Sequence, residues 1–235
     1  MTPPSTNTST HRRALVTGGG TGIGRAIAQK LRDKGLEVVI VGRRADVLRA
    51  TAAELGAVAL VADIVSEPER VIAEAGPLQV LVNNAGHQVA APIGQWTAAD
   101  LAGLYAVHTI APALLAQAFA AQCEGPGQII HIASTLAVRP APATAGYAAA
   151  KAGMLALSRA LALELAPQQI TANALLPGVV PTEMTSGRAE ALLHLHPLGR
   201  LGNGTDVADA VCWLIDAPWV TGAAIPVDGG LLVRE

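Results

Sequence analysis

The sequence predicts one α/β domain in which helices cover both faces of a doubly wound parallel sheet. Short apolar runs alternate with longer helix-like stretches along almost the whole chain, beginning with residues 14–17. A glycine-rich turn follows that first run and leads directly into a helix-like stretch. This alternation is typical of parallel sheets, because neighbouring parallel strands are joined by crossover helices.

The individual elements follow from apolar periodicity and from residues that cap helices. The expected strands cover residues 14–17, 38–41, 57–61, 80–83, 129–133, 170–175 and 225–227. The expected helices cover residues 23–34, 46–55, 97–122, 147–165 and 206–216, with a short one that ends at residue 75. Ser66-Glu-Pro-Glu69 resembles a capping box for the short helix, with proline in its first turn, and Thr97-Ala-Ala-Asp100 caps the long one.

Length and composition limit the classes of protein to consider. The 235 residues suit one domain with a sizeable core, expected at residues 13–235. Residues 1–12 lack an apolar signal core and are expected to form a disordered tail. Hydrophobic residues make up 51% of the chain and charged ones 14%, which indicates much surface buried in the fold or against other subunits. The net charge of −2 gives no indication of a nucleic-acid or anionic-membrane partner.

Neither a membrane span nor a metal site is expected. His108, Pro112 and Gln117 interrupt the longest apolar stretch before it reaches the ~18 residues of a span. The two cysteines, Cys123 and Cys212, lack the spacing of metal ligands. We therefore expect a reduced protein of the cytoplasm.

Three residues form a candidate proton-transfer device. Tyr147 and Lys151 are four positions apart in an alanine-rich stretch, so on a helix they share one face. A tyrosine hydroxyl ordinarily has a pKa near ~10, and a neighbouring ammonium lowers it by favouring the phenolate. Ser134 ends an apolar run and supplies a hydroxyl for a substrate oxygen. The set suits the interconversion of a carbonyl and an alcohol, although the Tyr-x-x-x-Lys spacing alone also fits a solvated pair.

Six motifs occur in the order and spacing of one known family. They are Thr17-Gly-Gly-Gly-Thr-Gly-Ile-Gly24, Asn83-Asn-Ala-Gly86, Ser134, Tyr147-x-x-x-Lys151, Pro177-Gly178 and Val227-Asp-Gly-Gly230. On these motifs the chain resembles the short-chain dehydrogenase/reductase family, closest in texture to its 3-oxoacyl-carrier-protein-reductase-like members. The resemblance covers essentially everything after about Arg13 and implies a single-domain Rossmann fold. It further implies that Ser134 holds the substrate oxygen, that Tyr147 moves the proton, and that Lys151 tunes Tyr147 and binds the nicotinamide ribose.

The resemblance also implies a nicotinamide dinucleotide site. Its glycines stand between a strand and a helix, where backbone can approach a pyrophosphate at the positive helix end, although they also fit a simple tight turn. Asp63 is implied at the adenine, with a capping role as the alternative, and Asn84 is open to a mainly structural role. The implied cofactor-binding residues are Gly18, Thr21, Gly22, Ile23, Gly24, Arg43, Asp63, Asn83, Ala85, Gly86, Tyr147, Lys151, Pro177, Val180 and Thr182.

The end of the second expected strand distinguishes the two dinucleotides. An acidic residue there would bind the ribose hydroxyls and repel a 2′-phosphate. Gly42 occupies that position and Arg43 follows, with a planar fork that matches phosphate oxygens. Arg25 is a second candidate, with a solvated helix arginine as the alternative. The sequence therefore predicts NADP(H) rather than NAD(H).

Family placement puts mostly small or apolar residues at the substrate end of the site. They are His87, Gln88, Leu136, Arg139, Val179 and Met184. We therefore expect an uncharged carbonyl or alcohol, with Arg139 either exposed in a loop or paired with a carboxylate. The turns at residues 122–128 and 167–169 contain no Lys or Arg, which counts mildly against docking of a carrier protein. His131 is expected to be packed in its strand, and His194 and His196 are not expected to bind metal.

His108 is the one departure from the family pattern, because a catalytic asparagine is expected at its position. Pro112 has no N–H, so in an α-helix the carbonyl of His108 lacks an intrahelical partner and is free to hold a relay water. An imidazole with an ordinary pKa near ~6.5 would make a relay contribution that depends on pH. The alternative is a packed histidine that fills the asparagine's space.

Together these features predict an NADP(H)-dependent oxidoreductase acting on a small, largely apolar substrate. A cofactor-binding regulatory or scaffold protein without catalysis, and a 3-oxoacyl reductase of the acyl-carrier-protein type, are the alternatives. The two long helices, residues 97–122 and 147–165, are apolar on more than one face, and the family pairs them between subunits, so a homotetramer is expected.

Overall fold

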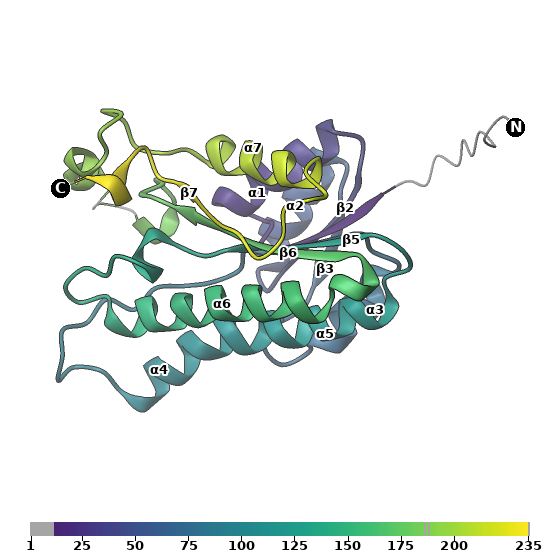
Figure 1. The fold of residues 1–235 in the computed structure, drawn as a ribbon, viewed down its shortest axis with the longest axis horizontal. Coiled ribbons are helices and arrows are strands. Elements are labelled where there is room, and N and C mark those ends of the chain that lie inside the picture. Colours follow the sequence, from purple (N-terminus) through teal and green to yellow (C-terminus); the bar gives the residue numbers. More distant parts are fainter. Residues whose placement is uncertain (1–11, 186, 188, 235) are drawn as a thin grey trace, which may run out of the picture.

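A seven-stranded parallel sheet forms the centre of the protein in a computed structural model that describes residues 12–185, 187 and 189–234. The strand order is β3-β2-β1-β4-β5-β6-β7, which confirms the predicted doubly wound Rossmann-type fold (Figure 1). The strands are β1 (Arg13–Thr17), β2 (Glu37–Gly42), β3 (Val58–Val61), β4 (Val80–Asn83), β5 (Gly127–Ile132), β6 (Ile170–Pro177) and β7 (Ala224–Val227).

Helices cover both faces of the sheet (Figure 1). One layer holds α1 (Gly22–Asp33), α2 (Ala45–Leu55) and α7 (Gly204–Ile215); the other holds α3 (Pro68–Ala75), α4 (Ala98–Tyr105), α5 (Ala111–Gln122) and α6 (Ala145–Glu164). Alternate residues of each central strand feed the two cores, so Val16 packs toward α1 and Leu15 toward α5. Because both faces are covered, strands such as β4 are buried at every position.

Several boundaries in the structure differ from those that the sequence predicts. Residues 1–11 of the expected tail lie outside the described residues, but Arg12 belongs to the fold, since its Nη2 donates to Gln128 Oε1 at 2.8 Å. The predicted capping box at Ser66 is wrong: the N-cap of α3 is Glu67, and no side chain caps this helix. Pro68 takes the first helical position, where its missing N–H costs nothing, and this shifts the cap by one residue. The capping box at Thr97 is confirmed.

The long helix predicted at residues 97–122 is interrupted by a π-helical turn, Ala106–Ile110. The N–H of Ala111 bonds to the carbonyl of Ala106, and this wider turn precedes Pro112, which cannot donate a hydrogen bond. By length and composition alone the stretch Ala98–Gln122, with mean hydropathy 1.4, could span a membrane, contrary to expectation. The polar interruptions do not lower the average enough. In this fold 44% of its most apolar window is buried, partly against α3 and α6.

The carboxyl ends of the strands assemble the functional residues along one edge of the sheet. The chain order reverses between β1 and β4, so the loops after these strands diverge and leave a crevice between them. Short 3₁₀ turns that the sequence did not predict shape its far side. They are Thr135–Ala137, Glu183–Thr185, Glu190–Leu195 and Leu231–Val233.

Candidate active site

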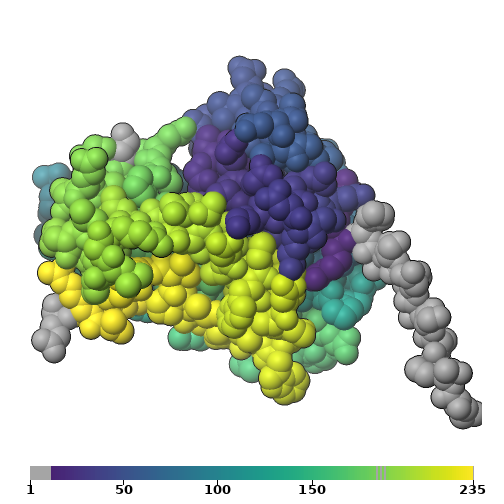
Figure 2. All heavy atoms as spheres, turned by 90° about the horizontal axis from the view of Figure 1, so that it is seen from above, coloured from purple at the N-terminus to yellow at the C-terminus, as the bar shows by residue number. Residues whose placement is uncertain are grey.

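One continuous cavity of about 1570 Å³ runs along this edge of the sheet. Its walls include the glycine loop after β1, the ends of β2 and β4, the loop after β5 and the residues after β6. Figure 2 shows an opening on this side, between the purple and blue β1–α2 region and the green segment after β6. The predicted site residues that line the cavity are Gly18, Thr21, Gly22, Ile23, Gly24, Arg43, Asp63, Ala85, Gly86, His87, Gln88, His108, Ser134, Leu136, Arg139, Tyr147, Lys151, Pro177, Val179, Val180 and Thr182.

The glycine loop requires glycine for two reasons. Gly18 and Gly22 have φ values of +66° and +53°, in the left-handed region that other residues rarely adopt. A Cβ on Gly24 would lie 2.3 Å from the carbonyl oxygen of Gly18, so only hydrogen fits. The loop leads into α1, whose N-cap residue Thr21 makes no side-chain cap bond. The first N–H groups of α1 therefore remain available to an anion in the cavity.

Asn83 and Asn84, at the end of β4, differ in their surroundings: Asn83 is buried away from the cavity and Asn84 lines it. Asn83 is 2% exposed, does not line the cavity, and contacts His131 Nδ1 through its Nδ2 at 3.4 Å, so its cofactor-binding assignment is wrong. Alternation along β4 turns its side chain toward the α5 side of the sheet. Asn84 lines the cavity, and its Nδ2 donates to Thr17 O at 2.8 Å and to Gly18 O at 3.3 Å. Its structural role is thereby confirmed.

Two arginines stand at the end of β2, and the sequence identified only one. Arg43 is 75% exposed and lies 3.7 Å from Asp63 across the cavity wall. Arg44, which sequence reasoning missed, donates to Glu183 Oε2 at 2.9 Å and to Thr21 Oγ1 at 3.2 Å. The doublet Arg43-Arg44 was the available signal. Arg25 is paired with Glu54 and does not line the cavity, which agrees with the alternative of a solvated helix arginine.

Ser134, Tyr147 and Lys151 converge in the middle of the cavity. Ser134 follows β5 and caps a 3₁₀ turn, its Oγ accepting from the N–H of Leu136 at 3.1 Å. Tyr147 and Lys151 lie in the first turns of α6 and are 8% and 3% exposed. Lys151 Nζ donates to the carbonyl of Ile132 at 2.7 Å and lies 5.7 Å from the centre of the Tyr147 ring. The predicted catalytic set is thus brought together.

Burial dominates the acid–base properties of this set. It raises the pKa of Tyr147 to about 12, while a hydrogen bond with Ser134 acts in the opposite direction. The expectation that Lys151 lowers the pKa of Tyr147 is not met, because its ammonium points to the Ile132 carbonyl. Burial lowers the pKa of Lys151 itself to about 7. At neutral pH Tyr147 is therefore protonated and suited to donating a proton.

His108 is a buried, neutral residue. Burial and the nearby Lys151 lower its pKa to about 2, so the predicted pH-dependent contribution near pH 6.5 is wrong. Its Nε2 lies 2.7 Å from the carbonyl of His87, and its ring meets the Tyr147 ring edge-on, with centroids 5.2 Å apart. Nε2 therefore carries the hydrogen. The alternative of a packed histidine agrees with this geometry; a water on its backbone carbonyl stays a prediction.

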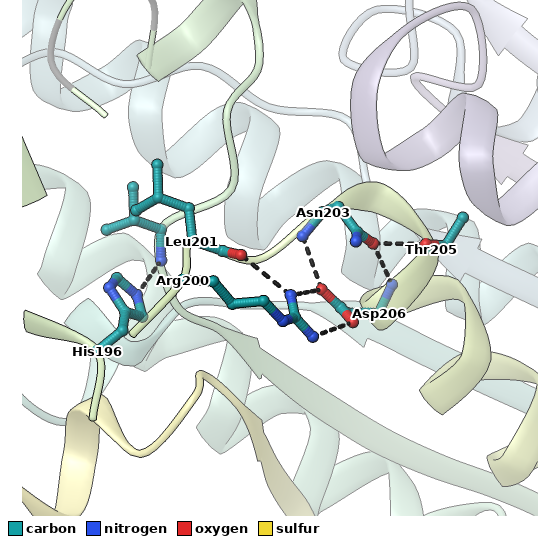
Figure 3. Close-up of polar contacts among 7 residues, drawn as sticks. His196, Arg200, Leu201, Asn203, Thr205 and Asp206 are labelled. Atoms are coloured by element: carbon teal, nitrogen blue, oxygen red, sulfur yellow. Dashed lines mark hydrogen bonds and ion pairs between the residues drawn. The ribbon is translucent and has the colours of Figure 1, made fainter. Parts of the chain in front are cut away.

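His131 and His196 are buried and have structural roles. His131 is fully buried in β5, as expected, and burial lowers its pKa to about 3. His196 is 4% exposed, and its Nε2 accepts from the N–H of Val179 at 3.1 Å (Figure 3). Close by, Arg200 forms a two-pronged ion pair with Asp206 at the start of α7 (Figure 3). Within the described residues no group of three His, Cys, Asp or Glu side chains could hold a metal.

The substrate end of the cavity is walled by segments far apart in sequence. Leu136 and Val179 line it as predicted, whereas the side chain of Met184 lies outside the described part of the chain. Arg139 is exposed in the loop after β5, as one of the two expectations has it, and its Nη1 donates to the carbonyls of Leu231 and Arg234 at 2.9 and 2.8 Å. Sequence reasoning missed Ala191, Leu192, Leu195, Leu231 and Arg234, which carry no motif.

Comparison with known proteins agrees with this geometry. A family model described as "Enoyl-(Acyl carrier protein) reductase" matches residues 18–232. The chain belongs to the short-chain dehydrogenase/reductase family. It is therefore an NAD(P)-dependent oxidoreductase of the short-chain type.

Individual short-chain dehydrogenase/reductase relatives match almost the whole chain. The "3-oxoacyl-[acyl-carrier-protein] reductase" of Rattus norvegicus is 33% identical, covering 92% of this chain and 96% of its own length. "Carbonyl reductase family member 4" of Xenopus tropicalis is 34% identical, covering 93% of this chain and 97% of its own length. The crystal structure of a blue fluorescent protein from a metagenomic library, in complex with NADPH, superposes with a TM-score of 0.89. It is 35% identical in sequence, covering 94% of this chain and 97% of its own chain.

We expect Gly86→Ala to destabilise the protein through His108. The added Cβ would lie 2.1 Å from His108 Cε1, and the buried ring has no room to move. Overpacking of this kind costs ~1–3 kcal/mol of unfolding free energy, measurable by urea titration.

His108→Ala in the same chain should recover most of that loss. Gly103→Ala is the matched control, because its Cβ would meet only ordinary contacts at 3.9 Å. An equal cost of Gly86→Ala with and without the His108 ring would contradict this explanation.

Proposed function

We propose that the protein is an NADP(H)-dependent reductase that converts a carbonyl on a small, largely apolar substrate to an alcohol. The protonated Tyr147 hydroxyl, set beside Ser134 in a cavity with a glycine cradle, carries this proposal. The apolar residues Leu136, Val179 and Leu192 support the substrate assignment.

The described residues fit a nicotinamide dinucleotide. The glycine loop and the uncapped start of α1 would hold its pyrophosphate, with Asp63 at the adenosine and Thr182 at the nicotinamide end. When bound, the cofactor supplies the hydride. Gly42 and Arg43 support NADP(H), because the strand end lacks the carboxylate that would bind the ribose hydroxyls and repel a 2′-phosphate. Arg44 adds a second guanidinium to that corner.

The chain's own residues divide the proton chemistry. Ser134 orients the substrate oxygen, and Tyr147 donates its proton as the alcohol forms. Lys151, buried and bonded to Ile132 O, stands behind Tyr147 to restore that proton. Since the Tyr147 pKa is raised to about 12, the hydroxyl carries the proton that reduction needs at neutral pH, and oxidation of the alcohol, which needs the phenolate, should accelerate as the pH rises.

Two alternatives have specific support. The names of relatives favour a 3-oxoacyl reductase of the acyl-carrier-protein type, but the turns at residues 122–128 and 167–169 contain no Lys or Arg for an acidic carrier. A regulatory or scaffold protein without catalysis has only His108 in its favour, against a complete Ser134, Tyr147 and Lys151 set.

We also propose a domain organisation, a cellular compartment and an oligomeric state for the protein. One sheet runs from β1 to β7, which supports a single domain over residues 13–235. The free thiols of Cys123 and Cys212 suit a reducing cytoplasm. Exposed apolar side chains on the long helices, including Leu163 at 80% and Ile110 at 54%, support a homotetramer.

Tyr147→Phe tests the proposed function. It removes the transferable proton but keeps the ring against His108, so turnover of a carbonyl substrate with NADPH should fall by ~10²–10⁴ while the cofactor still binds. His108→Asn, as the control, should keep activity within about tenfold. Turnover within about tenfold in Tyr147→Phe, or a wild-type protein that binds NADPH yet reduces no carbonyl, would refute the mechanism.

Cofactor preference follows from Gly42 and Arg43. One lost charge-assisted phosphate contact costs ~1.5–3 kcal/mol, so NADPH should bind roughly ten- to hundredfold more tightly than NADH in a fluorescence titration. Combining Gly42→Asp with Arg43→Ala should invert the preference, whereas Arg25→Ala, outside the cavity, should leave it unchanged. Equal affinities in the wild-type protein would count against NADP(H).

Light scattering tests the homotetramer. At micromolar concentration the mass should be four times that of one chain, and Leu163→Glu on α6 should reduce it by placing a charge in the helix-to-helix interface. Leu198→Glu, at an exposed apolar position off those helices, should leave the mass unchanged. A monomer alone would contradict the proposal.

A further inference from the structure

The two ends of the cavity differ in charge. Among the described lining residues the carboxylates are Asp63 and Glu183, and each lies beside an arginine of the cofactor end. Arg139 and Arg234 line the opposite end, where no described carboxylate lies within ion-pair distance of either. The substrate end therefore carries two positive charges that the described side chains do not balance.

Both guanidinium groups are held in place by backbone carbonyls. Arg139 Nη1 spans the carbonyls of Leu231 and Arg234, at 2.9 and 2.8 Å, and Arg234 Nη1 donates to the carbonyl of His194 at 2.6 Å. A carbonyl orients a guanidinium but does not neutralise it. Each guanidinium has five N–H donors, so these contacts leave donors on Nε and Nη2 of both arginines for a ligand. The contacts orient two side chains that are otherwise exposed to solvent.

Apolar side chains line the same cavity as these arginines and the reacting centre. Arg139 lies five residues after Ser134, and Leu136, Leu192, Leu195 and Leu231 line the same end of the cavity. A ligand that places its carbonyl at Tyr147 and extends along this apolar wall would bring its far end to the two forks. Guanidinium forks match the oxygens of carboxylate and phosphate groups.

We propose that Arg139 and Arg234 form a subsite for an anionic group, a carboxylate or a phosphate, at the far end of the carbonyl substrate. This deepens the proposed function and rests on it. The substrate is then a carbonyl compound with a short apolar stem and a terminal anion. The two arginines decide specificity and take no part in the proton transfer.

Matched substrate pairs test the subsite. The carboxylate pair is 4-oxopentanoate and its methyl ester, and the phosphate pair is 4-oxopentyl phosphate and 5-hydroxypentan-2-one, each reduced with NADPH. The charged member of at least one pair should have a kcat/KM roughly ten- to hundredfold higher, mainly through KM, as expected for charge-assisted hydrogen bonds. The pair with the larger ratio identifies the anion.

Arg139→Gln and Arg234→Gln should each reduce the charged-to-neutral ratio, and the double variant should bring it close to one. Arg139→Lys keeps the positive charge but loses the planar guanidinium group, so it should keep part of the charged-to-neutral ratio of kcat/KM. Arg49→Gln, an exposed arginine of α2 outside the cavity, is the matched control and should keep it all.

Equal kcat/KM values for both members of both pairs in the wild-type protein would overturn the subsite. An equal rise in KM for charged and neutral members in the arginine variants would also overturn the subsite, because it would show that the substitutions disturb the cavity without removing an anion contact. Glu235 follows Arg234 in the sequence and lies outside the described residues; a ratio that is close to one in the wild-type protein and appears only in Glu235→Gln would also overturn the assignment.

Calorimetry with the NADP⁺-loaded protein separates this proposal from the proposed function. Binding of the charged member that weakens at least tenfold in the double arginine variant supports the subsite even without turnover. Tight binding without turnover would refute the proposed function alone. Equal binding of both members of each pair would refute the subsite alone.

Discussion

The site depends on one set of hydrogen bonds between the loops that follow β1 and β4. Thr17 Oγ1 accepts from the N–H groups of Asn84 and Ala85 at 2.9 and 3.0 Å, and the Asn84 amide donates back to Thr17 O and Gly18 O. The pairing of β1 with β4 ends at Val16 and Val82, and the loops diverge beyond it, where the strand order reverses. The bonds hold the glycine loop against the Asn-Asn-Ala-Gly turn. Both segments line the cavity, together with the start of α6.

Desolvation sets the chemistry of the residues placed there. Tyr147, Lys151 and His108 are almost fully buried, and burial disfavours the charged form of each, so the pKa of the tyrosine rises while those of the lysine and the histidine fall. The result is a proton donor at Tyr147, a lysine that gains and loses its proton near neutrality, and a histidine that stays neutral. Burial in the fold therefore changes the pKa of Tyr147 more than the expected attraction to Lys151, one helical turn away, does.

Charge is distributed unevenly along the same cavity. At the cofactor end Arg43 and Arg44 face Asp63 and Glu183, whereas at the substrate end the two arginines are anchored only by carbonyl groups of described residues. The C-terminal turn thereby becomes part of the substrate wall. A family of enzymes with one catalytic set can change its substrate through such segments, because they touch the ligand without supporting the sheet.

The sequence by itself determined what depends on neighbouring residues. The order of strands and helices, the glycines that need a left-handed backbone or a close approach, the cap at Thr97 and the Tyr147–Lys151 spacing all follow from local sterics and periodicity. Only the tertiary structure decided which way a side chain points and what surrounds it. It turned Asn83 into the core, paired Arg25 with Glu54, buried His108 against Gly86, and brought Arg139 to the C-terminal turn. These outcomes depend on contacts between residues far apart in the chain, and on water excluded by packing, which no local pattern encodes.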